Sequence, residues 1–513
     1  MGLQPSSPSE VSPRVDPGAA ARRSWPWTLA AVLLAAFALR VIVATVSPSV
    51  LWPDEIFQSL EQAHRAAFGP GIVPWEFRTG ARSWLLPGLL AGVMKIAGAV
   101  SFGSPGYLTA VRSILALASL SVPAVAYFAV RRDFAKPLAL AACAMTAGWF
   151  ELIYFAPKAL TEAVAAHALL PGLLLTTLAL RPSRVASDRF RLVAGGLLIG
   201  VAVAFRMHLA VAALVPLAQV VRTRRVNDVL LFCGAAAVPL LASGMLDAVT
   251  WHYPFESYWL NFRANVIDGK SALYGASPWY ALASMVGRVW SWGALVLVPF
   301  AVLGARRWPG LAASALLLFL MHSALAHKEY RFVYPSIALV IVLASVGMAQ
   351  AAAYLSKKTA SPLVFSAALL ATLFAGVSAA RASRYDWRDV YLSTNPEPLP
   401  LWCHMRGVLL ASQVLSNDAT VCGVGLLNRR WNRTGGYAYL HRDVPLFEIR
   451  SDTAFTRYAG AMNVLLGPQD GPAQVGSFLR ERCWDETCLY RRAGECAVVP
   501  GYDVNEKLRL VGE

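Results

Sequence analysis

Residues 333–353 read VYPSIALVIVLASVGMAQAAA, a run of apolar and small side chains that contains no charged residue. An apolar segment of about 18 residues or more is long enough to cross the ~30 Å hydrocarbon layer of a bilayer. Two lysines, Lys357 and Lys358, follow the run, and basic residues beside a spanning helix are retained on the cytoplasmic side. This stretch therefore predicts a transmembrane helix whose C-terminal end faces the cytoplasm.

The rest of the chain has the same character. Of its 513 residues, 57% are apolar and 15% are charged, whereas ordinary soluble domains have roughly 45–50% apolar and about 25% charged residues. The mean hydropathy is +0.49. This composition excludes a soluble globular protein and predicts a multi-pass membrane protein. The formal charge of +16 does not indicate a nucleic-acid partner, because the basic residues lie in short clusters beside apolar runs rather than along one polar face.

The apolar runs predict about eleven transmembrane helices, with the N-terminus in the cytoplasm and the C-terminus outside. A further run at 84–100 is short and contains Pro87, Gly88 and Lys95, so we expect it to lie re-entrant or along the membrane interface. With this assignment the basic clusters between helices all fall in the cytoplasm. If 84–100 crossed the membrane, five of these clusters would lie on the wrong side. The predicted helices cover 27–46, 108–130, 137–155, 159–180, 192–205, 208–221, 228–249, 280–303, 309–326, 333–353 and 362–380.

Composition divides the chain into three regions. Residues 1–24 are rich in Ser and Pro, which predicts a disordered cytoplasmic tail. Residues 25–380 hold the transmembrane helices, and from residue 381 polar and apolar residues mix, which predicts a soluble α/β domain at 381–513 on the outer face. Within this domain we expect a helix at 399–415 and strands at 419–424, 444–449, 462–466 and 487–490.

Five of the seven cysteines lie in this C-terminal region, and an outward-facing domain would be in an oxidising space that permits disulfides. Cys483 and Cys488 are a candidate short pair, and the pairing among the five stays open. A zinc site is the competing interpretation, but neither the cysteine spacing nor His404 and His441 form a recognisable ligand set, so we expect no metal. The five cysteines are Cys403, Cys422, Cys483, Cys488 and Cys496.

Polar motifs that are unusual in a membrane protein fall together on the predicted outer side. A charged side chain at membrane depth costs about 2.5–3.5 kcal/mol, so such residues commonly face a cavity or a site. Asp54 and Glu55 follow the first helix, close to the lipid boundary, where a carboxylate could act as general base on a membrane-anchored acceptor. Pro53-Asp54-Glu55 is also a good helix start with acids placed to suit the helix dipole, and the two interpretations are compatible.

Basic residues on the same side are candidates for holding a phosphate, because guanidinium groups form bidentate, charge-assisted bonds with phosphate oxygens. Each of them could instead extend to lipid headgroups, and the residues alone leave that alternative open. The candidates are Arg78, Arg82, Arg206, Lys328 and Arg331.

The motifs PDEIFQ at 53–58, WEF at 75–77 and RSWLLP at 82–87 occupy the predicted first outer loop, and HKEYRF at 327–332 is followed by Tyr334-Pro335. Together these motifs resemble glycosyltransferase family 22, the dolichyl-phosphate-mannose-dependent mannosyltransferases of glycosylphosphatidylinositol and lipid-linked oligosaccharide synthesis. A further similarity, to the family's loop after the seventh helix, covers Asp247, 253–265 and 278–280.

The resemblance implies a GT-C type helical bundle, with Asp54 as the catalytic base and Glu55 beside it. Two departures, Trp52 in place of a frequent His and Trp251-His252-Tyr253 in place of a Phe/Tyr-Tyr-Gly pattern, bear on donor and acceptor identity rather than on the reaction type. Taking the motifs and the basic residues together, we assign donor-phosphate binding to His327, Lys328, Arg331 and Arg206. The remaining substrate-binding candidates are Glu76, Arg78, Arg82, Glu162, Asp247, Tyr253 and Glu329.

The expected activity is an inverting transfer of a hexose, with mannose as the expected sugar, from a polyprenyl-phosphate carrier to a lipid-linked or exported glycan acceptor. No cofactor is needed, and membrane lipid is the surrounding partner. The Ala- and Arg-rich composition and the outward C-terminal region suggest a bacterial member in the inner membrane, with its site facing outward. Two alternatives stay open, which are a lipid or glycan transporter or flippase and a GT-C enzyme that uses another polyprenyl-phosphate sugar.

Overall fold

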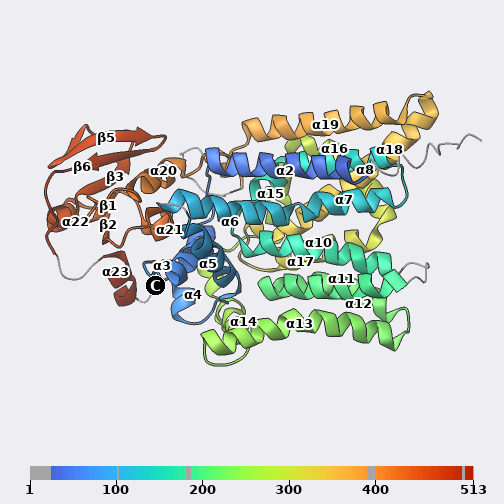
Figure 1. Cartoon of the computed structure of the whole chain (residues 1–513), viewed down its shortest axis with the longest axis horizontal. Coiled ribbons are helices and arrows are strands. Elements are labelled where there is room, and N and C mark those ends of the chain that lie inside the picture. Colours follow the sequence, from blue (N-terminus) through green and yellow to red (C-terminus); the bar gives the residue numbers. More distant parts are fainter. Residues whose placement is uncertain (1–24, 101–102, 181–185, 391–398, 499–502, 512–513) are drawn as a thin grey trace, which may run out of the picture.

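The computed structural model describes residues 25–100, 103–180, 186–390, 399–498 and 503–511. The predicted tail at 1–24 lies outside the described residues. Figure 1 shows a long bundle of helices with a smaller domain, built around a sheet, at one end. We call the end of the bundle that carries this domain the domain end, and the opposite end the far end.

The bundle contains the segments that the apolar runs predict. Each of the eleven runs falls on one helix or on two consecutive helices. These helices are α2 (Trp25–Val46), α6 (Gly103–Ser119), α7 (Ser121–Arg131), α8 (Lys136–Gly148), α9 (Phe150–Phe155), α10 (Thr161–Ala179), α11 (Ala186–Phe205), α12 (Ala210–Val221), α13 (Val226–Thr250), α15 (Ala281–Trp290), α16 (Ala294–Arg307), α17 (Pro309–Ala324), α18 (Tyr334–Thr359) and α19 (Leu363–Arg384). The expected fold class, a helical membrane bundle with a C-terminal α/β region, is confirmed.

The number of membrane crossings is a separate question. In the described part of the chain, seven helical segments are long and apolar enough to cross a membrane, judged by length and composition. The other predicted crossings fall on α8 with α9, α11, α12 and α17, which are shorter or carry more charge. The total of eleven therefore stays a prediction.

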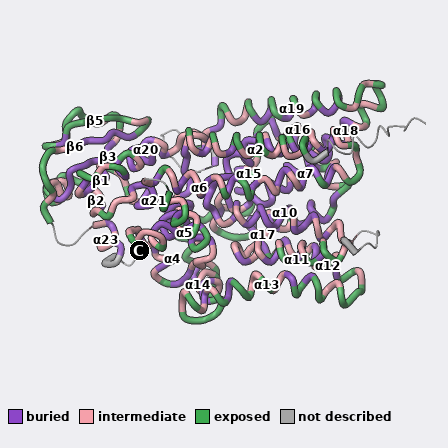
Figure 2. Tube along the Cα trace, viewed as in Figure 1, coloured by how far each residue is buried: buried purple, intermediate pink, exposed green. Residues whose placement is uncertain are grey.

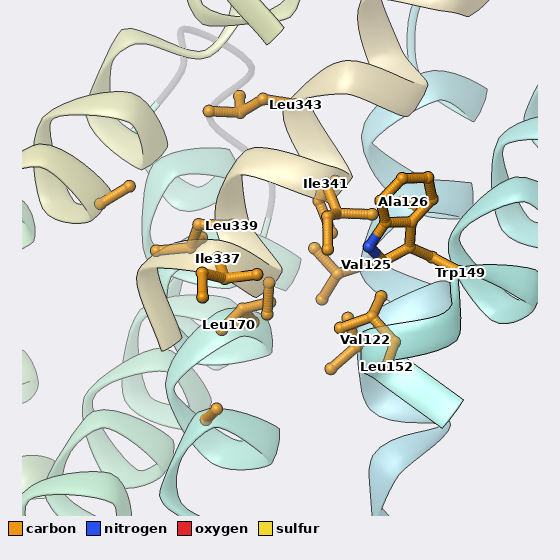
Figure 3. Packing of buried hydrophobic residues seen from close by; sticks show 14 of the residues in the cluster. Val122, Val125, Ala126, Trp149, Leu152, Leu170, Ile337, Leu339, Ile341 and Leu343 are labelled. Atoms are coloured by element: carbon orange, nitrogen blue, oxygen red, sulfur yellow. The ribbon is translucent and has the colours of Figure 1, made fainter. Parts of the chain in front are cut away.

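Helix α18 lies at the centre of the bundle. In the most apolar 18-residue stretch of its segment, 89% is buried inside the protein, whereas the corresponding share is 17% in both α2 and α13. Figure 3 shows Ile341 of α18 facing Val125 of α7, and Ile337 beside Leu170 of α10. By contrast, α13 and α19 lie at opposite edges of the bundle (Figure 1) and carry many exposed residues (Figure 2). Exposed apolar side chains on edge helices form a surface suited to lipid.

The basic clusters lie at the far end. Figure 1 shows that the turns between α7 and α8, α12 and α13, and α18 and α19 are all at that end. There Arg307 of α16 pairs with Asp133 at 3.0 Å, which ties the end of α16 to the α7–α8 turn. The basic residues that the positive-inside rule assigns to the cytoplasm thus gather at one end, opposite the sheet.

The segment after α2 folds at the domain end. It forms the π-helix η1 (Glu55–Leu60) and the helices α3 (Glu61–Phe68), α4 (Trp75–Arg78) and α5 (Leu85–Gly98). Helix α5 is the run at 84–100, and it packs against α3 and α6 at the domain end (Figure 1). Its 14 residues make it shorter than the seven long apolar segments. Here the first loop and the C-terminal domain share one apolar core, which includes Phe57, Leu60, Val424 and Val464.

The C-terminal domain holds a mixed sheet with strand order β2-β1-β3-β6-β5-β4. Strand β1 is parallel to β2 and β3, and β6 is antiparallel to β3 and β5. Four strands lie at or beside their predicted positions, but β5 was not predicted because its sequence, FLRERCW, carries three charges. The elements are α20 (Arg406–Leu415), β1 (Val424–Leu427), α21 (Gly436–Leu440), β2 (Leu446–Ile449), α22 (Asp452–Tyr458), β3 (Val464–Pro468), β4 (Gln474–Val475), β5 (Phe478–Trp484), β6 (Thr487–Arg491) and α23 (Val504–Val511).

Two disulfides stabilise this domain. Cys483 pairs with Cys488 across the β5–β6 hairpin, as the sequence suggests. Cys422 pairs with Cys496, which is 74 positions away and could not be chosen from spacing alone. Cys403 is free and partly buried.

Candidate active site

Asp54 stands at the entrance to η1. The carbonyl of Pro53 accepts the backbone N–H groups of Ile56 and Phe57 at 3.0 and 2.9 Å, so the helix begins directly at the Pro-Asp-Glu motif. The Asp54 side chain remains 29% exposed, whereas Glu162 is 3% exposed. Asp54 is therefore a helix-start residue, as its sequence suggests, and it also keeps an open side toward solvent.

Arg331 connects the first loop to the segment before α18. Its guanidinium forms an ion pair with the Asp54 carboxylate and a second one with Glu329 at 2.5 Å. The carboxylate of Glu162, at the start of α10, lies 3.7 Å from the same guanidinium. Three carboxylates from three separate segments therefore surround one buried cation.

Arg206 extends this network from the end of α11. It pairs with Glu162 at 2.8 Å, so Glu162 bridges the two arginines. The ring of Phe332 lies 5.7 Å from the Arg206 guanidinium and 5.0 Å from that of Arg331, which supports both cations by cation–π attraction. We call the group of Asp54, Glu162, Arg206, Glu329 and Arg331 the charge network.

A pocket opens beside the charge network. Arg82, Arg206 and His208 line it together with hydroxyl and amide side chains. Arg82 donates to the Gln58 side chain, and Gln58 in turn donates to Glu76 at 2.7 Å. The first loop thereby supplies one arginine of the pocket and α11 the other. The polar members of the lining are Arg82, Ser83, Thr161, Arg206, His208, Ser257, Tyr258 and Asn261.

Glu55 faces a different environment from Asp54. It is buried and pairs with the Lys158 ammonium at 3.4 Å, and Lys158 also donates to the Ser49 carbonyl and lies over the Tyr154 ring at 4.6 Å. Burial raises the pKa of Glu55 above its ordinary value, against the attraction of Lys158. These contacts make Glu55 part of the packing between the first loop and the segment before α10.

The motif at 327–331 divides into two parts. His327 bonds to Glu329 at 3.2 Å, and this bond raises the pKa of His327. Burial acts to raise the pKa of Glu329, but Arg331 and His327 outweigh it, and the pKa is lowered. Lys328 precedes the 3-10 turn η6 (Tyr330–Val333) and donates to the backbone carbonyls of Ser277 and Leu325. The spacing of Lys328 and Arg331 is typical of two residues on one helical turn, but the structure does not place them on one.

Three further predicted residues lie outside the charge network. Asp247 is fully buried and accepts the N–H and hydroxyl of Ser257 at 3.0 and 2.6 Å, which anchors α14 (Glu256–Phe262). Tyr253 is 44% exposed in the turn between α13 and α14. Arg78 donates to the carbonyl of Leu508 in α23. Glu76 is connected through Gln58 to Arg82 of the pocket, and burial raises the pKa of Glu76.

The sequence-based search missed Glu151. This buried carboxylate accepts the indole N–H groups of Trp149 and Trp290 at 2.7 and 2.8 Å, and the hydroxyl of Tyr330. Tyr330 is next to Arg331, so Glu151 supports the turn that presents Arg331 to Asp54. A charged residue inside the apolar run at 137–155 was the available signal. In the described residues, no group of three or more His, Cys, Asp or Glu side chains is placed to hold a metal ion.

Comparisons with known proteins fit this arrangement. The Alg9-like mannosyltransferase family matches residues 31–387, which include every member of the charge network. A GPI mannosyltransferase 3 from Yarrowia lipolytica is 27% identical over 427 residues, which cover 81% of this chain and 76% of that protein. The mannosyltransferase APTG1 of Arabidopsis thaliana is 26% identical, with the same coverage of both chains.

Solved structures with a similar fold include one of ArnT. The crystal structure of ArnT from Cupriavidus metallidurans bound to undecaprenyl phosphate aligns with a TM-score of 0.55, and the alignment covers 91% of this chain and 98% of that one. The sequence identity is 12%, so the similarity concerns the arrangement of helices and domain rather than particular side chains.

Proposed function

Because the chain belongs to the Alg9-like mannosyltransferase family and is a multi-pass membrane glycosyltransferase, we propose that it transfers mannose from a polyprenyl-phosphate carrier to a lipid-linked or exported glycan acceptor. The transfer proceeds with inversion at the outer face of the membrane, where the domain end lies. The relatives' names support mannose as the sugar. The observation that carries the proposal is the pairing of Asp54 with Arg331 beside a pocket lined by two arginines.

Asp54 is the general base in this proposal. Its open side meets the acceptor hydroxyl, and its paired side is oriented by Arg331. As the acceptor oxygen bonds to the anomeric carbon, the bond from that carbon to the phosphate oxygen breaks and the hydroxyl proton passes to Asp54. A positioned base of this kind contributes about 10²–10⁴ in rate. Glu55 supports the loop in this proposal, because it is buried and paired with Lys158.

The leaving phosphate occupies the pocket of Arg82, Arg206 and His208 in this proposal. Guanidinium groups suit a phosphate because they offer paired N–H donors and keep their charge. Arg206 reaches both the pocket and Glu162, so it couples the phosphate site to the network that holds Asp54. Charge on the leaving oxygen is then met by donors that are already in place, which lowers the transition-state energy. Arg331 and His327 lie beside the same site, and both contact Glu329. Lys328 holds the neighbouring backbone by donating to the carbonyls of Ser277 and Leu325.

One experiment separates this function from the alternatives. Purified protein in lipid is incubated with polyprenyl-phosphate [14C]mannose and a panel of lipid-linked acceptors, and labelled products are counted. Transfer of label supports the proposal. Transfer from a different polyprenyl-phosphate sugar, with mannose inactive, would assign another donor. Movement of an intact lipid across vesicles without transfer would favour a flippase, an alternative that family membership does not support.

A further inference from the structure

The C-terminal domain contacts the helix that begins at Asp54. The π-helix η1 runs directly into α3, so Asp54 precedes a continuous helical segment, 55–68, and Glu61 lies near the middle of that segment. On the side of Asp54 the segment meets Arg331. On the side of Glu61 it meets α21, a short turn of the C-terminal domain that also contacts α6. The segment is therefore held at its start and near its middle by parts of the chain that are distant in sequence.

Glu61 makes the contact with α21. Its side chain is fully buried, and its carboxylate accepts the backbone N–H groups of Tyr437 at 3.0 Å and Ala438 at 2.8 Å. It also accepts the N–H of Ile72 at 2.8 Å, which fixes the loop after α3. Three backbone donors on one carboxyl group leave it little freedom to move.

Gly436 makes this close approach possible. Its φ of +58° lies in the left-handed region, which favours glycine. A Cβ built at this position would lie 2.5 Å from Oε2 of Glu61, closer than van der Waals contact permits. A side chain at 436 would therefore displace either the carboxylate or the turn. The observed position of the Glu61 carboxylate therefore requires a glycine at 436.

Other contacts surround this one on both sides. Phe57, in η1, packs edge-to-face against Trp431 with ring centroids 4.6 Å apart. His64, one turn after Glu61, bonds to His441 at 2.9 Å. From α6, Tyr107 donates to the carbonyl of Ala438 at 2.5 Å. The turn at 436–440 is thus enclosed by α3 and α6, and the helical segment carries contacts to the C-terminal domain along its length.

We propose that Glu61 is a positioning residue, and that the C-terminal domain, through residues 436–440, holds the η1–α3 segment so that Asp54 faces the acceptor. This inference rests on the proposed role of Asp54 as base. Glu61 acts through the helix and does not touch substrate. A displacement of about 1 Å at a reacting group can cost 10²-fold in rate, so loosening this contact should affect turnover more than substrate binding.

The test compares Glu61→Gln and Gly436→Ala with a matched control, Glu481→Gln. Glutamine keeps the size of Glu61 but replaces one acceptor oxygen with a donor that faces N–H groups. Glu481 lies on β5, paired with Arg491 at the surface and outside the shared core. We expect kcat to fall about 10–100-fold in both test variants, with donor and acceptor KM changing less than twofold, and no change in the control. The double variant should be no worse than the more severe single variant, because both changes disrupt one contact.

Hydrogen exchange provides a readout that does not depend on activity. We expect the backbone amide hydrogens of Glu61→Gln to exchange faster at residues 53–60 as well as at 436–440. Faster exchange at 436–440 alone, or a wild-type kcat in Glu61→Gln, would overturn it and leave the proposed function standing. If the wild-type protein transfers no sugar from any polyprenyl-phosphate donor, the proposed function fails, and Asp54 can no longer be the group that is positioned. In that case the exchange data show only whether residues 53–60 and 436–440 move together.

Discussion

Asp54 and Arg331 are 277 positions apart in the sequence and form an ion pair at the domain end of the bundle. The pair joins the loop after the first helix to the turn before the central helix α18. Arg331 also binds Glu329, and Glu162 lies beside it. The base that the sequence predicts is therefore oriented by a cation from the second motif.

Replacing Asp54 with Asn tests the base. The amide keeps the size of the side chain and loses the proton acceptor, so transfer should fall by about 10²–10⁴. Because Asp54 is partly exposed, the thermal midpoint of unfolding should change little. The measurements are the initial rate of mannose transfer and Tm in the same detergent. If Asp54→Asn keeps most of its activity and Glu55→Gln loses it, the roles of the two carboxylates must be exchanged.

Glu55 and Lys158 should behave as a structural pair. Removing one partner leaves the other charge buried and unpaired, which costs about 3–5 kcal/mol, whereas replacing both can be neutral. We expect Glu55→Gln and Lys158→Met each to lower Tm, and the double variant to recover most of the loss. A double variant as unstable as the sum of the single variants would show that the two charges do not stabilise each other.

Arg206 tests the proposed phosphate pocket. Arg206→Ala removes a cation from the lining, so the KM for the polyprenyl-phosphate donor should rise at least tenfold, while the KM for the acceptor changes less. Arg263→Ala is the control, because Arg263 is 59% exposed and pairs with Asp268 at 3.8 Å. Unchanged donor KM in Arg206→Ala would locate the phosphate elsewhere in the site.

The contact of Glu61 with α21 should depend on pH. Burial raises the pKa of Glu61 from 4.5 to about 7, so the folded protein holds a proton that the unfolded chain releases. This contribution to stability is fully present below pH 4.5 and is lost as pH rises through 7. The Tm advantage of wild type over Glu61→Gln should therefore shrink between pH 4.5 and pH 7. If this Tm advantage instead grew between pH 4.5 and pH 7, folding would lower the pKa of Glu61 rather than raise it.

Orientation in the membrane can be measured directly. The positive-inside rule assigns the basic clusters of the far end to the cytoplasm, so we expect a reporter fused after Lys358 to be cytoplasmic and one after Glu513 to be external. The disulfides Cys422–Cys496 and Cys483–Cys488 should resist thiol labelling of intact cells until a reductant is added. Both reporters on the same side would contradict the outward-facing site.

The sequence predicted most of the helical bundle because the length and polarity of an apolar run are local properties. The sequence also singled out the charged residues that the structure brings together in the charge network, since ionisable residues in a membrane protein are rare and conspicuous. It could not predict which charges pair. Lys328 and Arg331 share a motif, yet one binds backbone carbonyls and the other binds Asp54, because the chain changes from extended to 3-10 between them.

Other elements were hidden for different reasons. Strand β5 contains three consecutive charged residues and was not recognised, because its neighbours β4 and β6 define it rather than an apolar pattern of its own. Glu151 was visible as a charged residue within an apolar run, but its role was not, because its partners are Trp149 and two aromatic residues far along the chain. In both cases the deciding contacts are tertiary.

The apolar core shared by the first loop and the C-terminal domain has a consequence for biosynthesis. Phe57 and Leu60 are translated early, but Val424 and Val464 of the same core leave the ribosome only after all the predicted membrane helices have been made. Until then the loop presents apolar surface and the buried carboxylate of Glu61 has no turn to bind. A chain that is truncated before residue 436 therefore has an unfinished first loop with exposed apolar side chains.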